Sequence, residues 1–173
     1  MTTTTMTEKR TMTEKNTTTQ VYRVFIKATP QAIWDAITKP EWAEKYGYQS
    51  RVEYDLRPGG TYRGFANEPM KAHGAPDVII VGEVVEADPP RKLVQTWHPV
   101  WDPQSAAEAA TRLTFEIEED RGGVTRLTVT HDVAGAPLTA KMVAGEVANA
   151  GGGWSYVLSD LKTLLETGKA LGG

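Results

Sequence analysis

The stretch GGGWSYVLSDLKTLLETG, residues 151–168, predicts a long amphipathic helix that ends at Gly168 in a left-handed cap. The apolar residues of one face recur every three or four positions: Trp154, Val157, Leu158, Leu161, Leu164 and Leu165. The opposite face is polar: Ser155, Ser159, Asp160, Lys162 and Glu166. A helix of about 15 residues is about 22 Å long. The rest of the chain must therefore supply an apolar surface of that length.

Seven segments before this helix show the alternation of apolar and polar residues that is typical of half-buried strands. Tight turns such as Pro58-Gly59-Gly60 and Arg121-Gly122-Gly123 join some of them, which indicates an antiparallel meander. We expect the connections at 67–77 and 99–110 to be loops. The predicted strands are 20–28, 51–56, 61–65, 78–87, 92–98, 111–118 and 124–132.

Two short helices are predicted directly after the first strand. Thr29-Pro30 reads as an N-cap followed by the first helical residue, and the helix ends before Pro40. Pro40 then begins a second short helix that Trp42 anchors. The order strand, two helices, six strands and a long helix predicts an α+β fold. In it, a strongly curved antiparallel sheet of about seven strands wraps around the C-terminal helix.

The composition favours an ordinary soluble domain with a cytoplasmic location. The chain has 173 residues, no cysteine and a net charge of -3, so disulfides and cysteine chemistry are excluded. This charge gives no reason to expect nucleic acid or a membrane as partner, and no apolar run reaches transmembrane length. The three histidines lie on separate segments without a metal-binding spacing, so we expect neither a metal nor a cofactor.

The predicted domain covers most of the chain. Residues 1–19 are rich in threonine and contain TMTEK twice, which predicts a disordered tail with little to bury. We expect residues 20–168 to form a single domain and residues 169–173 to form a short second tail.

Five segments, in this order, resemble the START-like (SRPBCC, helix-grip) superfamily. More specifically, they resemble the family named after the activator of Hsp90 ATPase homologue 1. They are ATPQAIWDAITKPEWAEKY (28–46), DLRPGGTYRGF (55–65), VGEVVEADPPRKLVQTW (81–97), TRLTVTHD (125–132) and GGGWSYVLSDLKTLLE (151–166). The resemblance implies a seven-stranded sheet around a C-terminal helix, often with an internal cavity. It leaves the function open, because the superfamily includes carriers, cyclases, aromatases and receptors.

Strand alternation places several polar side chains on the face that is expected to meet the helix. His131 follows Leu127 and Val129, and Glu83 follows Ile79 and Val81. A buried carboxylate needs a partner, so a His131–Glu83 pair could perform acid–base chemistry. The alternative is that Glu83 lies at a bulge near Gly82 and points to water, while His131 is a core histidine with satisfied hydrogen bonds.

Aromatic residues supply the other candidates. Trp97 and Trp101 lie around Pro99, where they form either a lid over a cavity or a contact that pins the loop to the sheet. Tyr54 and Tyr62 flank the predicted hairpin turn. The candidate ligand-binding residues are Tyr54, Tyr62, Glu83, Gln95, Trp97, Trp101, His131, Trp154 and Leu158.

Three functions remain open at the level of sequence. The first is a binding protein, rather than an enzyme, for a hydrophobic or aromatic small molecule between the helix and the sheet. The second is an enzyme of the cyclase or aromatase kind that uses His131 or Glu83 as acid–base groups. The third is a protein-interaction module, similar to a co-chaperone or a regulator's partner, without a ligand. The chain is expected to be a monomer or a homodimer.

Overall fold

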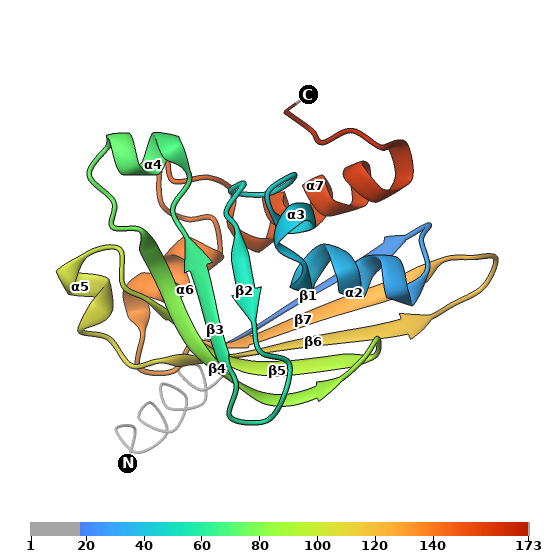
Figure 1. Ribbon diagram of the computed structural model, residues 1–173, viewed down its shortest axis with the longest axis horizontal. Helices are drawn as coiled ribbons and strands as arrows, with labels where there is room; N and C mark the ends of the chain where they lie inside the picture. Colours follow the sequence, from blue (N-terminus) through green and yellow to red (C-terminus); the bar gives the residue numbers. More distant parts are fainter. Residues whose placement is uncertain (1–17, 173) are drawn as a thin grey trace, which may run out of the picture.

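All seven strands predicted from residue alternation are present in the computed structural model, which describes residues 18–172 (Figure 1). They form one antiparallel sheet in the order β1-β7-β6-β5-β4-β3-β2. Strands β2 to β7 form a meander in chain order. β1 pairs with β7 and is one edge of the sheet, and β2 is the other edge. The strands are β1 (Thr19–Ile26), β2 (Val52–Tyr54), β3 (Thr61–Phe65), β4 (Val78–Asp88), β5 (Lys92–Pro99), β6 (Thr111–Glu119) and β7 (Thr125–Asp132).

The helices predicted around the first strand and at the C-terminal end are confirmed. They are α2 (Pro30–Thr38), α3 (Pro40–Ala43) and α7 (Gly153–Thr167). The Thr29 side chain accepts a hydrogen bond from the backbone of Ala32, as expected of an N-cap. Gly168 has a φ of 82° and donates its N–H to the carbonyl of Leu164, which makes the predicted C-cap.

The prediction that residues 67–77 and 99–110 are wholly loops is wrong. Each contains a short helix, α4 (Glu68–Ala72) or α5 (Pro103–Ala106). The N-caps Asn67 and Asp102 accept hydrogen bonds from Met70 N and Ser105 N, and proline occupies the first turn of each helix. Helices of four or five residues are too short to show apolar periodicity, so only their caps could have indicated them. A further short helix, α6 (Pro137–Val143), precedes α7.

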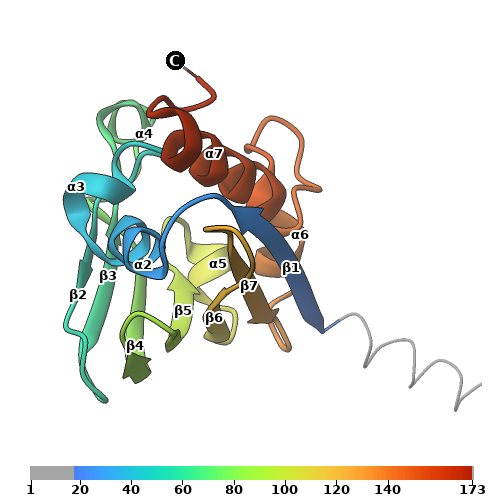
Figure 2. The same ribbon diagram turned by 90° about the vertical axis from the view of Figure 1, so that its right-hand side faces the viewer.

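The core lies between α7 and the concave face of the sheet. Figure 2 shows the strands curving beneath α7, with α2 on the same side of the sheet. Leu158, Leu161 and Leu164 of α7 are buried, as the apolar stripe predicted. They belong to a core that also includes residues of α2 and of the sheet: Ile26, Ile33, Trp34, Leu93, Ile117, Leu127 and Val129.

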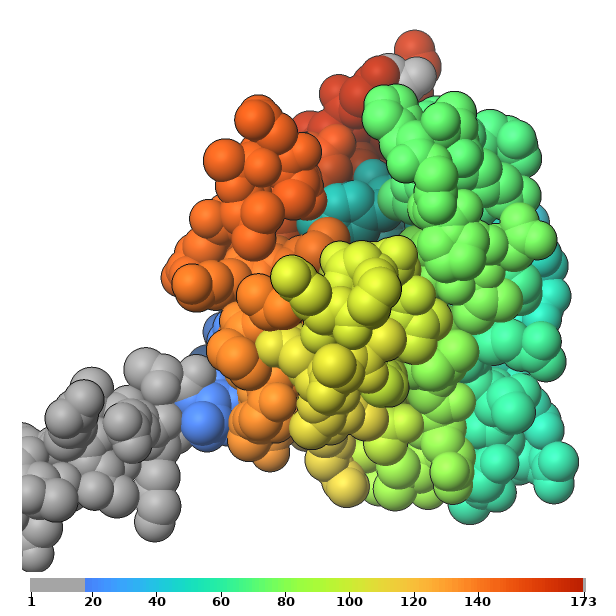
Figure 3. All heavy atoms as spheres, turned by 90° about the vertical axis from the view of Figure 1, so that its left-hand side faces the viewer, coloured from blue at the N-terminus to red at the C-terminus, as the bar shows by residue number. Residues whose placement is uncertain are grey.

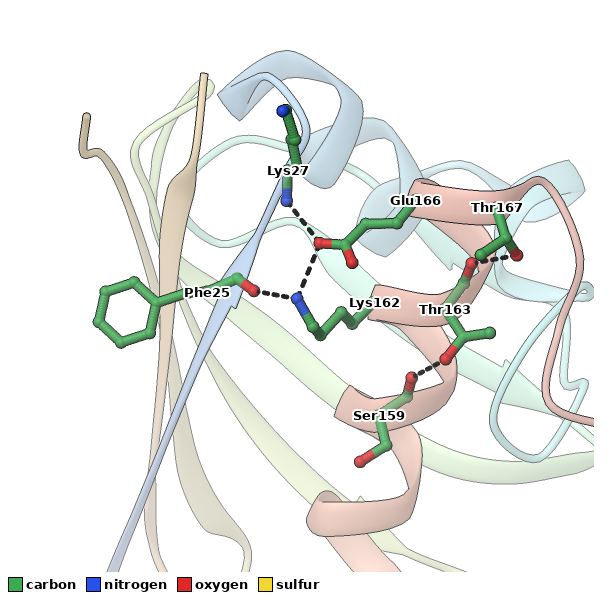
Figure 4. Close-up of polar contacts among 7 residues, drawn as sticks. All are labelled: Phe25, Lys27, Ser159, Lys162, Thr163, Glu166 and Thr167. Carbon is green, nitrogen blue, oxygen red and sulfur yellow. Dashed lines mark hydrogen bonds and ion pairs between the residues drawn. The ribbon is translucent and has the colours of Figure 1, made fainter. Parts of the chain in front are cut away.

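The second half of α7 is fastened to the edge strand β1 by a pair of charged residues (Figure 4). Lys162 Nζ donates to the carbonyl of Phe25 at 2.7 Å, and Glu166 Oε2 accepts from the backbone N–H of Lys27 at 2.8 Å. Lys162 and Glu166 also bond to each other at 2.8 Å, and chiefly this bond lowers the pKa of Glu166. The pair therefore satisfies two backbone groups at the open edge of the sheet.

Asp160 departs from the amphipathic pattern, because it is only 3% exposed. Its placement on the solvent-facing side of the helix was wrong. Its two carboxylate oxygens accept from the backbone of Gly47 and of Leu171, each at 2.8 Å. The carboxylate thus holds the chain after α3, and residues just beyond the predicted domain end, onto α7. The boundary at residue 168 nevertheless stays a prediction.

Replacing Asp160 by alanine should lower the free energy of unfolding by about 1–2 kcal/mol. Two backbone donors would lose a charged acceptor, although Gly47 is only half-buried and the Leu171 side chain is exposed, so water can take over part of the role. Urea unfolding measures the change. Ser155→Ala, at an exposed position of the same helix, is the matched control and should change stability by less than about 0.5 kcal/mol. Equal effects in both variants would contradict the structural role of Asp160.

The predicted tail falls mostly on residues 1–17, which lie outside the described residues. Its inner boundary shifts slightly, because Thr19 is the first residue of β1 and faces Asp132 of β7. Thr18 also accepts a hydrogen bond from the backbone of Val133. Within residues 18–172, no helix has the length and the apolar character needed to cross a membrane.

Candidate functional site

A cavity of about 370 Å³ lies between α7 and the concave face of the sheet. Figure 3 shows the molecule hollowed between α4 (green), the segment around α5 (yellow) and the segment from α6 toward α7 (orange). Each of these segments contributes to the lining: Met70 and Ala75, Trp101, and Met142 and Val143. The two short helices that the sequence did not predict therefore lie beside the opening.

A row of aromatic rings forms one wall of the cavity. Neighbouring rings meet edge to face, with centroids 5.3–6.2 Å apart, a preferred arrangement for aromatic pairs. The row begins in the loop after β5, reaches α7 at its fourth member and ends on β6, in the order Trp101, Trp97, His131, Trp154 and Phe115. The three tryptophans and Phe115 line the cavity, whereas His131 is fully buried behind them.

His131 is a fully buried histidine whose ring nitrogens both have partners. Trp154 Nε1 donates to His131 Nδ1 at 3.1 Å, so the ring proton is on Nε2. That nitrogen lies 2.7 Å from Thr111 Oγ1, which in turn donates to the carbonyl of Trp97. Burial lowers the pKa of His131 to about 4, with a small opposing effect of Asp132. At neutral pH the ring is therefore neutral and holds Trp154 in the cavity wall.

Of the two alternatives for Glu83, the structure agrees with the outward position and not with the inward one. Glu83 is exposed, and it faces Thr61 of β3 while its backbone N–H bonds to Thr96 Oγ1. The cause is a one-residue register shift between β3 and β4 beside Ile79, where Ile79 and Ile80 both line the cavity. Beyond that shift Val84 faces the core instead. Glu83 does not approach His131, so the proposed acid–base pair is absent.

Gln95 and Leu158 lie behind the cavity wall, which corrects their expected direct contact with a ligand. Gln95 is fully buried and its Oε1 accepts a hydrogen bond of 2.6 Å from the hydroxyl of Tyr54. Leu158 is buried in the core cluster. The remaining candidates do line the cavity: Tyr54, Tyr62, Trp97, Trp101 and Trp154. A ligand-binding role for these five stays a prediction.

Sequence reasoning missed other lining residues. The inward face of β6 carried a usable signal, because Leu113 and Phe115 alternate with polar neighbours and both reach the cavity. Tyr46 and Tyr48, in the segment after α3, had no periodic signal. The further missed members come from many elements: Ile37, Ala43, Val52, Met70, Ala75, Ile79, Ile80, Met142 and Val143.

The site has little ionic character. None of the residues that line the cavity is Asp, Glu, Lys, Arg or His. Burial raises the pKa of Tyr46 and of Tyr54, and that of Tyr62 to about 12, so these phenols stay protonated at neutral pH. In the described part of the chain, no group of three or more His, Asp or Glu side chains could hold a metal ion. The arrangement can enclose an apolar molecule.

Comparison with known proteins agrees with this architecture. The structure resembles a Mesorhizobium loti protein (TM-score 0.63, 19% identity, 85% of this chain and 96% of that chain). It also resembles the Aha1 dimer from Colwellia psychrerythraea (TM-score 0.61, 19% identity, 88% of this chain and 98% of that chain). A third similar structure is an HSP90 activator from Plasmodium falciparum (TM-score 0.53, 22% identity, 90% of this chain and 91% of that chain). These identities are low, so the likenesses show the fold. A search of curated proteins gave no match.

A family model identifies the sequence more specifically. The model for Activator of Hsp90 ATPase homolog 1-like proteins matches residues 27–166, from the end of β1 almost to the end of α7. That range contains α2, α3, the strands of the meander and almost all of α7. The match therefore covers every residue that lines the cavity. The chain belongs to the Activator of Hsp90 ATPase homolog 1-like protein family, within the START-like superfamily.

Proposed function

We propose that this protein binds a hydrophobic or aromatic small molecule in the cavity between α7 and the sheet. The observation that carries the proposal is the open, aromatic-walled cavity of about 370 Å³. Small-molecule sites are concave, mainly apolar and supplied with a few polar groups, and most enclose about 300–1,000 Å³. A molecule that displaced water from these rings would gain the free energy of apolar burial.

An enzyme of the cyclase or aromatase kind is less well supported, because the groups proposed for its chemistry are in the wrong places. Glu83 is on the solvent side of β4, and both nitrogens of His131 are engaged within the fold. A general acid or base must come within hydrogen-bonding reach of the reacting atom. The geometry therefore favours binding without catalysis by these two residues.

A bulky residue at the mouth of the cavity should block binding. Ala75 lines the cavity beside α4, so Ala75→Trp should weaken binding of the neutral dye Nile red by at least about tenfold. Fluorescence titration with the full chain measures the dissociation constant. Ala72→Trp is the matched control, because Ala72 is exposed on α4 and does not line the cavity. Unchanged affinity in Ala75→Trp would show that the dye binds elsewhere and would count against the proposal.

A molecule that copurifies with the protein would identify the natural ligand class. Native mass spectrometry of gently purified protein should show a mass increase that disappears on denaturation. The same preparation of Ala75→Trp should show less of the added mass. An added mass that is equally abundant in both proteins would point to a surface contaminant.

A protein partner is a second candidate, and edge strand β1 is the observation that favours it. Val21 and Phe25 are 49% and 48% exposed on its outward face, one on each side of Arg23. Two similar structures are described as an HSP90 activator and as a dimer. Light scattering during size-exclusion chromatography distinguishes a monomer from a homodimer of this chain.

A further inference from the structure

Tyr62 differs from the other tyrosines of the cavity in the state of its hydroxyl group. Four tyrosines line the cavity, and three of them donate their hydroxyl hydrogen to an acceptor of the protein. These acceptors are the Ala36 carbonyl for Tyr46, the Ala150 carbonyl for Tyr48 and Gln95 Oε1 for Tyr54. The hydroxyl of Tyr62 has no acceptor among residues 18–172.

The surroundings of Tyr62 make this free donor significant. The side chain is only 6% exposed. Its hydrogen therefore remains available to a partner outside the protein. Buried polar groups are nearly always satisfied, and each exception calls for a partner. Burial raises the pKa of Tyr62 to about 12, so the hydroxyl keeps this hydrogen at neutral pH.

The hydroxyl can be reached from the cavity. Arg126 Nε is the one fully enclosed side-chain nitrogen or oxygen without a partner in the described part of the chain. The Tyr62 oxygen has no partner in the same part of the chain and is therefore not fully enclosed, and Tyr62 itself lines the cavity. A ligand in the cavity can approach it without a change in the wall.

Glycine at position 64 keeps the space beside this hydroxyl open. Gly64 is two residues after Tyr62 on the same face of β3. A Cβ at this position would lie 3.4 Å from the Tyr62 oxygen and 3.4 Å from Ile80 Cβ, which is ordinary contact and compatible with folding. On the neighbouring strand, Gly82 is directly opposite Tyr62, and a Cβ there would clash with the carbonyl of Thr96. Only Gly64 can therefore be enlarged as a test.

The cavity offers no counter-charge to a ligand. Its lining contains no ionisable acid or base other than the tyrosine phenols. Transfer of a carboxylate or an ammonium group into such surroundings is strongly unfavourable without a paired charge. An uncharged oxygen, in contrast, can be desolvated at moderate cost and can then accept the hydrogen of Tyr62.

We infer that the cavity selects a neutral, mainly apolar molecule whose carbonyl or ether oxygen accepts a hydrogen bond from the Tyr62 hydroxyl. This rests on the proposed function, because it names the class of molecule that the same cavity takes. Tyr62 fixes the orientation of the ligand, and the aromatic row supplies most of the contact area. Gly64 leaves the neighbouring side of the Tyr62 oxygen uncovered.

Two probes of the same shape separate the hydrogen bond from apolar burial. Benzophenone has a carbonyl group where diphenylmethane has a methylene group. Tyr62→Phe should weaken benzophenone binding about five- to tenfold, the usual effect of one buried neutral hydrogen bond, and should leave diphenylmethane binding within about twofold. Quenching of tryptophan fluorescence measures both, because Trp97, Trp101 and Trp154 line the cavity. An equal effect on both probes would overturn the inference.

Two further variants test whether the effect belongs to the free hydroxyl. Tyr54→Phe removes a hydroxyl that already donates to Gln95, so it should change the binding of both probes alike. Gly64→Ala retains Tyr62 but crowds its oxygen, so it should selectively weaken benzophenone binding. This variant also decides the matter if Tyr62→Phe does not fold. An unaltered preference between the probes in Gly64→Ala would count against the inference.

The charge of the probe provides the last comparison. Diphenylacetate retains the two rings and adds a carboxylate, so it should bind wild-type protein at least about tenfold more weakly than benzophenone. Equal affinity would overturn the selection of neutral molecules. If neither benzophenone nor diphenylmethane binds to wild-type protein, the proposed function itself fails, which is a different result from the loss of Tyr62 selectivity.

Discussion

Replacing Leu161 by alanine should lower the free energy of unfolding by roughly 2–5 kcal/mol. Leu161 is 1% exposed and lies in the core cluster between α7 and the sheet. The substitution removes the transfer free energy of three carbon atoms and leaves a void that the β-sheet cannot collapse to fill. Since Leu161 does not line the cavity, the void would be new and enclosed. Urea unfolding followed by circular dichroism measures the loss.

A matched leucine separates burial from residue type. Leu171 lies just beyond α7 and is 50% exposed, so Leu171→Ala should change stability by less than about 0.5 kcal/mol. A Leu161→Ala protein with wild-type stability would mean that α7 does not grip the sheet in solution. That result would also remove the wall on which the cavity depends.

The fold could be predicted because its signals are local and repeated. Strand alternation, the Thr29-Pro30 helix start and the Gly168 cap each depend on a few neighbouring residues, and all agree with the structure. The apolar stripe of α7 then required one large concave surface, which a seven-stranded meander can supply. Consistency of local signals with one architecture is what makes such a prediction possible.

The cavity was harder to predict, because its shape depends on a register shift and on short helices, which the alternation of apolar and polar residues does not reveal. A one-residue register shift beside Ile79 turned Glu83 outward and brought both Ile79 and Ile80 to the cavity. The mouth is lined partly by Met70 of α4 and by Trp101 just before α5, and both helices are too short for periodicity to reveal. The sequence therefore indicated aromatic residues near a cavity, such as Trp97 and Trp154, but not which polar groups accompany them.

Asp160 and His131 show a related limit of prediction from the sequence. Both were judged by the side of the element on which they lie, yet their roles depend on partners distant in the sequence. Asp160 bonds to the backbone of Gly47, and His131 to Thr111 and Trp154. A charged residue on a helix is usually solvated, so only tertiary contacts could identify Asp160 as buried.

Acidification should destabilise the protein through His131. The pKa of His131 is about 4 in the folded protein and 6.5 ordinarily, mainly because burial disfavours the charged ring. Between these two values the unfolded chain binds a proton that the folded protein does not, so stability falls as the pH falls. The loss attributable to this residue should reach roughly 3 kcal/mol at pH 4 and change little below it.

A variant without the imidazole isolates this contribution. Carboxylates such as Glu166, whose pKa is lowered in the folded protein, also lose stabilising interactions in acid, so the wild-type profile alone is ambiguous. His131→Gln has no group that titrates in this range at that position, and its free energy of unfolding should depend less steeply on pH between about 6.5 and 4. Urea unfolding at a series of pH values gives both profiles. Parallel profiles would show that His131 is not held neutral by burial.

The same titration bears on the cavity wall. A protonated His131 carries hydrogen on both nitrogens, so Nδ1 can no longer accept from Trp154 Nε1. Two donors would then face each other at 3.1 Å in a buried site, which either keeps the proton out or displaces the indole. Near-ultraviolet circular dichroism of the tryptophans should therefore change together with stability as the pH falls toward 4. A histidine that merely filled space would lower stability without moving Trp154, so the coincidence of the two signals tests its role in positioning the wall.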